Sequence, residues 1–321
     1  MRVCLMIEGQ EGVTFAQWVA LTGACERLGF DALFRSDHYM TLGGGPPRDT
    51  LDAWTTLAAL GSRTTTLRLG TLVSPVTFRH PAVLAKSVVT ADHASGGRVE
   101  LGMGAGWHEG EHRAFGFPFP DPEVRFRMLE EQVEIVHRLL DRREEAVDFA
   151  SAHYRLEGCR ATPKPVQDPH PPLLLGGRAG PRAARLAARW ADEYNVNFTG
   201  PDGCRDARAR LDAGCEALGR DPATLPMSLM TGTVVGADRA ELLERLRRIM
   251  ALEGAEGDPS AFLVGVREEG WLAGTVDEVL EQLAALAAAG VRRVMLQHLL
   301  HDDLDAIEQL GREVLPAASG L

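Results

Sequence analysis

Residues 67–104 read LRLGTLVSPVTFRHPAVLAKSVVTADHASGGRVELGMG and contain a full unit of strand, helix and strand. The runs at 67–73 and 98–103 are short and largely apolar, as expected of strands that are buried on both faces. Pro81 stands where a helix would begin, a position at which the missing proline N–H is tolerated. The stretch therefore predicts two parallel strands joined by a helix.

The same alternation extends over the whole chain. Predicted strands occupy residues 3–7, 32–35, 67–73, 98–103, 172–175, 193–196, 227–235 and 291–296. Predicted helices occupy residues 14–28, 50–60, 122–140, 181–190, 205–218, 275–289 and 303–314, with two more that begin at Pro81 and Asp238. Capping boxes are expected at Thr14 and Asp238, and Thr50 is expected to cap its helix. Eight strand–helix units without a break in composition favour a single α/β domain over residues 1–321, a (β/α)8 TIM barrel, over an open doubly wound sheet.

Two connections are longer than a barrel requires. Residues 146–171 contain a hairpin-like pair of short strands at 147–149 and 153–156 and then a proline-rich return. Residues 251–270 are glycine-rich and acidic and are expected to form a loop. Long connections in compact barrels are usually functional, so both are candidates for shaping a site.

Charge and cysteine content exclude several classes of protein. The formal net charge is −11, and no basic stripe is present, so a nucleic-acid binder is not expected. The five cysteines form no paired clusters, as in a reducing compartment. No run approaches the roughly 18 apolar residues of a membrane span, and the first residues do not fit a signal peptide. We expect a cytoplasmic protein with a small-molecule substrate, and neither a membrane nor a nucleic acid as partner.

In a barrel of this kind the active site lies at the carboxyl ends of the strands. One strand is followed there by Asp37 and His38. A histidine changes charge near neutral pH and can donate or accept a proton, and the adjacent acid can bind the polar edge of a cofactor. A structural histidine that caps the next loop is the alternative.

Glycines mark two further strand ends. Gly102, Gly104 and Gly106 follow the fourth strand without the spacing of a dinucleotide fingerprint, so we interpret them as backbone that a flat ring can approach. Gly176 and Gly177 open a helix, where free N–H groups and the helix dipole favour a phosphate, with Arg178 or Arg182 adding charge. A tight turn that binds nothing is the alternative.

Residues 108–112 read HEGEH and match the zinc-binding pattern H-E-x-x-H through His108 and His112. Glu130, Glu131 or Glu134 would then be a third ligand. The glycine in the middle of the motif and the aromatic, proline-rich segment that follows it argue against a zinc helix. Trp107 and the phenylalanines of that segment can instead form an apolar wall over a ring-shaped ligand.

Several motifs together resemble the bacterial luciferase-like superfamily, and within it the oxidoreductases that use the deazaflavin coenzyme F420. They are SDH at 36–38, GTLVSPVTFRHP at 70–81, GMGAGW at 102–107 with Glu111, LLGG at 174–177 and AD at 191–192. The similarity runs in order over almost the whole chain, and it implies a (β/α)8 barrel with the deazaflavin at its carboxyl-terminal face.

The resemblance also implies roles for individual residues. Asp37 and His38 would contact the ring system, and Leu72–Val73 would form a bulge with a non-prolyl cis peptide behind it. Ala105 and Gly106 would line the cofactor, and Gly176 and Gly177 would hold its phosphate. Arg178 and Asn197 are added as cofactor contacts because of their places next to strand ends, not because of the resemblance. Trp107 stands where sugar-phosphate dehydrogenases of the family carry a catalytic glutamate, so it is expected to face a different substrate. Glu109 or Glu111 would substitute for that glutamate, and Glu111 is the residue we name as catalytic beside His38.

The leading hypothesis is an F420-dependent oxidoreductase that moves a hydride between the deazaflavin and a small organic substrate, with His38 handling a proton. An FMN-dependent luciferase-like monooxygenase is the main alternative, because it shares most of these motifs. A zinc hydrolase and a barrel that binds cofactor without catalysis are the others. Relatives are often dimers, so a homodimer is also expected.

Overall fold

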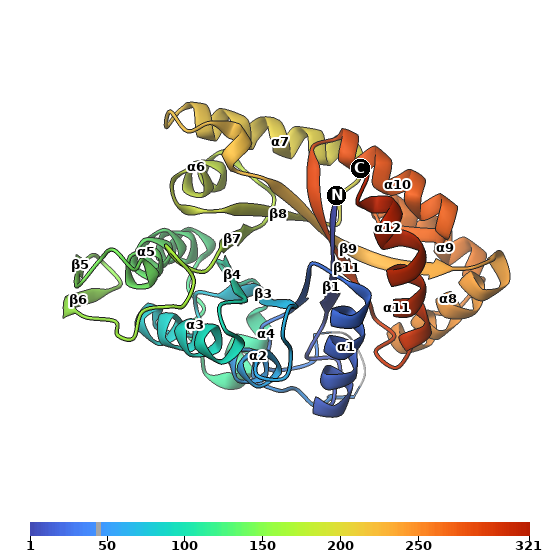
Figure 1. Cartoon of the computed structure of the whole chain (residues 1–321), viewed down its shortest axis with the longest axis horizontal. Helices are drawn as coiled ribbons and strands as arrows, with labels where there is room; N and C mark the ends of the chain where they lie inside the picture. The colour runs from blue at the N-terminus through green and yellow to red at the C-terminus, as the bar shows by residue number, and fades with distance from the viewer. Residues whose placement is uncertain (43–45) are drawn as a thin grey trace.

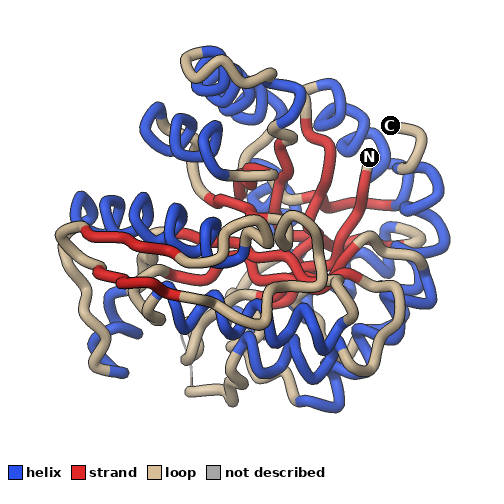
Figure 2. The backbone as a smooth tube through the Cα atoms, turned by 60° about the vertical axis from the view of Figure 1, so that its left-hand side comes forward, coloured by secondary structure: helices blue, strands red, loops and turns tan. Residues whose placement is uncertain are grey.

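Eight parallel strands close into a barrel in the computed structural model, which describes residues 1–42 and 46–321. The strands are β1 (Arg2–Ile7), β2 (Ala32–Arg35), β3 (Arg68–Pro75), β4 (Val99–Gly104), β7 (Leu173–Gly176), β8 (Glu193–Asn197), β9 (Met227–Gly236) and β11 (Val291–Gln297). Pairing of β8 with β9 and of β11 with β1 completes the ring. Figure 2 shows the strands at the centre and helices around them. The predicted α/β (β/α)8 fold is confirmed, and all eight strands lie where the sequence indicates.

Helices follow the strands in turn and cover the barrel (Figure 1). They are α1 (Phe15–Leu28), α2 (Ala53–Gly61), α3 (Pro81–Ser95), α4 (Glu109–Phe115), α5 (Pro122–Leu140), α6 (Pro181–Trp190), α7 (Pro201–Glu216), α8 (Arg239–Glu253), α9 (Pro259–Glu268), α10 (Val276–Ala288), α11 (Leu304–Gln309) and α12 (Leu315–Ala318). A short 3-10 turn (Pro222–Thr224) precedes β9, and a π-helical turn (Leu310–Val314) joins α11 to α12. None of the described helices is long and apolar enough to cross a membrane.

Local sequence signals account for most helix starts. The capping boxes at Thr14 and Thr275 are present, and the Asp238 side chain accepts from the Glu241 N–H. The expectation for Thr50 is wrong, since Asp52 caps α2 by accepting from the Thr55 N–H at 2.8 Å. Helix α7 also begins earlier than predicted, at Pro201, because proline is favoured in a first helical turn.

The prediction for one of the two long connections is confirmed, and the prediction for the other is wrong. The predicted hairpin exists as β5 (Val147–Ala150) and β6 (Arg155–Cys159), which pair antiparallel away from the barrel, on the left in Figure 1. Residues 251–270, expected to form a loop, instead contain α9. They are followed by β10 (Leu272–Thr275), which pairs in parallel with the last four residues of β9. Asp258 at the cap and Pro259 in the first turn are the signals for α9 that a reading of glycine and acid content missed.

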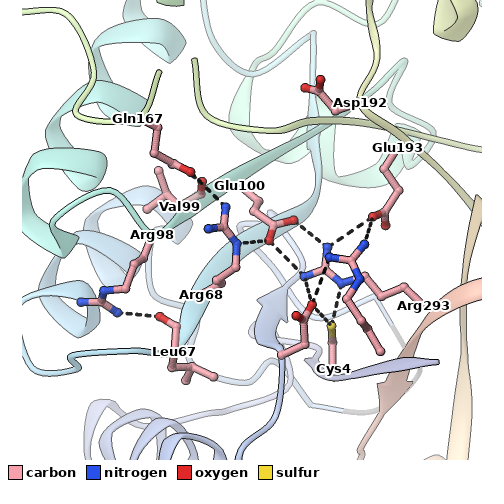
Figure 3. Close-up of polar contacts among 12 residues, drawn as sticks. Cys4, Leu67, Arg68, Arg98, Val99, Glu100, Gln167, Asp192, Glu193 and Arg293 are labelled. Atoms are coloured by element: carbon pink, nitrogen blue, oxygen red, sulfur yellow. Dashed lines mark hydrogen bonds and ion pairs between the residues drawn. The ribbon is translucent and has the colours of Figure 1, made fainter. Parts of the chain in front are cut away.

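The barrel interior is layered along its axis. A middle layer of apolar side chains comes from Cys4, Met6, Ala32, Phe34, Leu72, Leu174, Met230 and Met295. Below it, near the amino ends of the strands, Arg293 is 1% exposed and pairs with Glu100 at 2.7 Å and Glu193 at 3.4 Å (Figure 3). It also pairs with Asp31 at 2.7 Å. This network closes the amino end of the barrel and leaves the carboxyl end as the place for a site.

Candidate functional site

A cavity of about 930 Å³ opens at the carboxyl ends of the strands. Residues from the ends of several strands line it, as expected for a barrel with its site on this face. Of the residues that the sequence selected, those that line it are His38, Leu72, Val73, Ala105, Gly106, Trp107, Gly176, Gly177 and Asn197. The structure thus brings nine predicted site residues around one space, while Asp37, Glu111 and Arg178 lie outside this lining.

His38 follows β2 and lines the cavity, and its ring is held by Glu111, which lies outside the lining. Its Nδ1 lies 2.7 Å from Oε2 of Glu111, whose side chain is completely buried. The other Glu111 oxygen accepts from the Tyr39 N–H at 2.5 Å. With the carboxylate at Nδ1, the Nε2 atom of His38 is the ring nitrogen left for the cavity. Trp107 stands edge-on to this imidazole, with 6.1 Å between ring centroids, and is 65% exposed.

The HEGEH segment at residues 108–112 holds Glu111 next to His38. His108 caps α4, because its Nδ1 accepts from the Glu111 N–H at 3.1 Å. His112 is buried, with Nε2 at 2.6 Å from the Thr77 hydroxyl and Nδ1 at 2.7 Å from the His108 carbonyl. Both nitrogens of His112 are therefore engaged, and the described residues contain no cluster of three or more side chains fit to hold a metal. This geometry speaks against the zinc alternative and places Glu111, not Glu109, beside His38.

The side chain of Asp37 bonds to neighbouring residues and does not line the cavity. Its carboxylate accepts from the Ser74 hydroxyl at 2.6 Å and from both terminal nitrogens of Arg79, at 2.6 and 3.1 Å. Although burial disfavours the charged guanidinium, the contact with Asp37 raises the pKa of Arg79. The side chain of Asp37 thus lies behind the wall and anchors the loop that carries His38, and its expected cofactor contact stays a prediction.

The floor beside His38 is a bulge in β3. The register between β3 and β4 shifts between Thr71 and Ser74, and a non-prolyl cis peptide joins Leu72 to Val73, as the family resemblance implies. A Cβ at Gly104 would stand 2.6 Å from a Val73 methyl group, and one at Gly102 would stand 2.3 Å from the Thr71 carbonyl oxygen. These two glycines therefore make room for the bulge on the neighbouring strand. The interpretation that they exist for a ring to approach is corrected to that extent.

A second cavity of about 470 Å³ continues from the first. The two share Gly177, Asn197 and Phe198, and Arg178 and Arg210 line the second. It lies between the N-termini of α6 and α7, whose N-cap residues are glycines without side-chain caps. Uncapped N–H groups and two guanidinium groups suit an anion.

Arg182 does not join this anion site. Its guanidinium bonds to Glu130 at 2.6 and 2.8 Å and to Glu123 at 2.8 Å. Of the two arginines expected to add charge, Arg178 lines the second cavity and is exposed there, and its contact with an anion stays a prediction. Arg210 was missed, because it lies on α7, far from the glycine motif in sequence, and its Nε bonds the Ala179 carbonyl at 2.9 Å.

Sequence reasoning expected the ends of the first and last strands at this face but assigned no role to the residues there. The Glu8 carboxylate accepts from the amides of Gln10 at 2.8 Å and Gln297 at 2.7 Å. Glu8, Gln10 and Gln297 all line the cavity, and so do His301 and Trp271. Burial and the nearby His298 lower the pKa of His301 to about 4. Glu8 and Gln297 stand at predicted strand ends, so the signal was present for them, whereas nothing local marks His301 or Trp271.

Comparison with known proteins agrees with this geometry. The profile of the luciferase-like monooxygenase family matches residues 3–293. An F420-dependent glucose-6-phosphate dehydrogenase from Microbacterium testaceum is 29% identical, covering 91% of this chain and 90% of the relative. An FMNH(2)-dependent dimethylsulfone monooxygenase from Pseudomonas putida is 30% identical, covering 74% and 70%. The crystal structure of monooxygenase RslO1 from Streptomyces bottropensis has a TM-score of 0.84 at 22% identity, covering 98% and 99%, and supports the fold. With its barrel, its bulged third strand and a family match over most of its length, the chain belongs to the luciferase-like monooxygenase family.

Proposed function

We propose that the protein is an F420-dependent oxidoreductase that transfers a hydride between the deazaflavin and a small organic substrate. The observation that carries this proposal is a continuous space that runs from His38 to Arg178. One end of it offers the bulge at Leu72–Val73 and a proton-handling side chain, and the other offers cations and helix N-termini. The order of these features along the space matches a cofactor with a planar head and an anionic tail.

The residues present fit such a group. Leu72, Val73, Ala105 and Gly106 line the part of the cavity next to His38 and would lie against the ring. Gly176, Gly177 and Asn197 lead toward Arg178 and would carry the chain and its phosphate. When bound, the deazaflavin supplies or accepts the hydride. The protein excludes water from the wall and fixes the direction of approach.

His38 would be the catalytic acid or base. The Glu111 carboxylate fixes the tautomer with the hydrogen on Nδ1, so Nε2 can take a proton from a substrate hydroxyl or return one. Glu111 is buried and touches neither space, so we assign it a positioning role through His38 and not the direct one first expected. Asp37, through Arg79 and Ser74, would hold the same loop.

The second cavity favours F420 over FMN. The F420 tail continues beyond its phosphate with carboxylate groups, whereas FMN ends at its phosphate. About 470 Å³ of space with Arg178 and Arg210 lies beyond the shared residues, where such a tail would need room and positive charge. Relatives of this chain include enzymes named for each cofactor, and this space is the observation that supports F420.

Anaerobic titration of the full chain with F420 and with FMN, side by side, tests the proposal. We expect F420 to bind at least tenfold more tightly. Arg178→Gln should weaken F420 binding by three- to tenfold and FMN binding by less, because it removes charge from the tail site. Arg185→Gln, on the exposed face of α6, is the matched control. Preference for FMN together with oxygen-dependent turnover would establish the monooxygenase alternative instead.

We further propose a single domain over residues 1–321 that works in the cytoplasm as a homodimer. All five cysteines are free, which supports a reducing compartment, and the family resemblance supports the dimer. Sedimentation equilibrium tests the dimer against the 34.8 kDa mass of one chain.

A further inference from the structure

One sector of the cavity is acidic. Carboxylates reach its lining from the loops after β1 and β11 and from the C-terminal ends of α8 and α9. They belong to Glu8, Glu11, Asp302, Glu253 and Glu269. This sector borders His38, because β1 is the neighbour of β2 in the barrel. It is separate from the second cavity, where Arg178 and Arg210 lie. The space that a substrate would use beside the cofactor therefore differs in charge from the space for an anionic tail.

Few cations balance these carboxylates. Among the described lining residues, Arg48 is the one lysine or arginine, and its guanidinium is paired with Glu11. Asp302 is paired with Arg248 at 3.0 Å from outside the cavity. Burial keeps His301 neutral near pH 7, since it lowers the pKa of that ring to about 4. An anionic substrate would find no free cation in the described part of this sector.

Glu253 and Glu269 are the carboxylates with the least compensation. Neither forms an ion pair among the described residues, although both line the cavity. Both residues are exposed where they line the cavity. Partial burial of Glu253 and then the like charge of Glu269 raise the pKa of Glu253, so the two carboxylates lie within electrostatic reach of each other. A cation between them would relieve that repulsion.

Uncharged groups in the same space also suit an organic cation. Trp107 and Trp271 line the cavity, and the faces of indole rings attract alkylammonium groups. The Nε2 atom of His301 has no hydrogen-bond partner among the described residues, so it adds an unsatisfied neutral polar group to the lining. Aromatic rings beside uncompensated carboxylates are the combination that recognises amines and quaternary ammonium compounds.

We propose that the substrate of this enzyme is an organic cation and that its cavity discriminates against anions of the same shape. The inference rests on the proposed function, since it assumes that the cofactor fills the sector near Arg178. It separates this chain from the relative named for a phosphorylated sugar. The recognition is electrostatic, so it should weaken as salt screens the carboxylates.

Three probes with one aromatic group and different charges test this selectivity. Benzyltrimethylammonium, benzyl alcohol and benzyl phosphate are titrated calorimetrically into the F420-loaded full chain at pH 7.5 and low salt. We expect the cation to bind at least tenfold more tightly than the phosphate, with the alcohol between them, and the ratio to shrink at 0.5 M salt. Binding of the phosphate as tightly as the cation overturns the proposal, and so does an alcohol that binds as tightly as the cation. Absence of binding by all three up to 10 mM overturns it too.

A charge-neutral variant locates the effect. Glu253→Gln combined with Glu269→Gln should reduce the ratio of cation to phosphate affinity at least threefold. Glu281→Gln, on α10 and exposed, removes one carboxylate outside the cavity and should leave the ratio unchanged. An unchanged ratio in the double variant overturns the assignment to this sector. If F420 fails to bind, the proposed function fails, and the same titrations on the free chain still decide the charge preference.

Discussion

The two ends of the barrel use the same kinds of residue to opposite effect. At the amino end, Arg293 is enclosed by Glu100, Glu193 and Asp31, and its Nε lies 3.0 Å from the Cys4 sulfur (Figure 3). At the carboxyl end, His38 and the acidic sector face a space of about 930 Å³. Charged groups at the first end pair mainly with one another, although Oε1 of Glu193 has no hydrogen-bond partner among the described residues. At the second end, Glu253 and Glu269 form no ion pair among the described residues.

The difference shows in how each carboxylate is held. Burial alone would raise the pKa of Glu100, but Arg293 and then Arg68 lower it to about 2, so this carboxylate is ionised and fully occupied. Glu253 at the open end has a raised pKa and forms no ion pair among the described residues. A closed network of this kind contributes to stability or to the uniqueness of the fold, whereas unsatisfied groups around a cavity are available for a ligand.

Removing the central cation of the closed end should have the largest effect. In Arg293→Met, Glu100 and Glu193 would remain buried without their main partner, and we expect a loss of about 3–5 kcal/mol in the free energy of unfolding. Urea denaturation followed by circular dichroism measures it. Arg292→Met, on the exposed side of the same strand, is the control and should change stability by less than about 0.5 kcal/mol. Similar losses in the two variants would contradict the central role of Arg293.

Removing the histidine at the open end should leave the fold intact and reduce catalysis. We expect His38→Asn to lower kcat at least 100-fold in the F420-loaded enzyme, since general acid–base catalysis contributes roughly 10²–10⁴-fold. Steady-state rates with the identified substrate measure this loss, and urea denaturation checks that stability is retained. A variant that keeps full kcat would favour the barrel that binds cofactor without catalysis.

Glu111→Gln separates positioning from catalysis in the same assay. The amide keeps the shape of Glu111 but no longer fixes the His38 ring through a carboxylate at Nδ1, so we expect a smaller loss in kcat, about 10- to 100-fold. KM should change little, because Glu111 lies outside the lining of the cavity. A variant that keeps full kcat would mean that Glu111 has only a structural role.

The fold could be predicted almost completely from the sequence. Continuous apolar runs identify strands buried on both faces, and proline or capping residues locate helix starts such as Pro81 and Pro122. The errors have local physical causes. At α2 the acceptor is Asp52 and not Thr50, and α9 was hidden in a segment whose glycines and acids are typical of a loop.

The site could be predicted in part, because a strand end and its first loop residue occupy fixed places on the barrel rim. His38, Gly177 and Asn197 follow that rule. What the rule cannot give is side-chain pairing between distant segments. The contact of Glu111 with His38, the engagement of Asp37 by Arg79, and the position of Arg210 beside Ala179 depend on packing between separate loops.

The smallest of the expected effects concerns acid, which should weaken the carboxyl end of the barrel at a higher pH than the amino end. Burial lowers the pKa of His298, which is 5% exposed beside the cavity end of β11, to about 4 from the 6.5 of a free histidine. Between pH 4 and pH 6.5, His298 is therefore protonated in the unfolded chain but largely neutral in the folded protein. The stability contributed by neutral His298 is therefore complete above pH 6.5 and is lost as the pH falls to about 4. Glu100 behaves differently, since its contribution is complete above pH 4.5 and is lost only as the pH falls toward 2.

We therefore expect the free energy of unfolding to fall by about 1–2 kcal/mol between pH 7.5 and pH 5 because of His298, before the amino-end network is affected. Urea denaturation at the two pH values measures the decrease. In His298→Gln the decrease should be smaller by about that amount, since no imidazole remains there to take up the proton. His153→Gln, at a half-buried histidine on the β5–β6 hairpin, is the control and should keep the decrease of the parent chain. If both variants keep the full decrease, the carboxyl end is not the part of the barrel that acid weakens first.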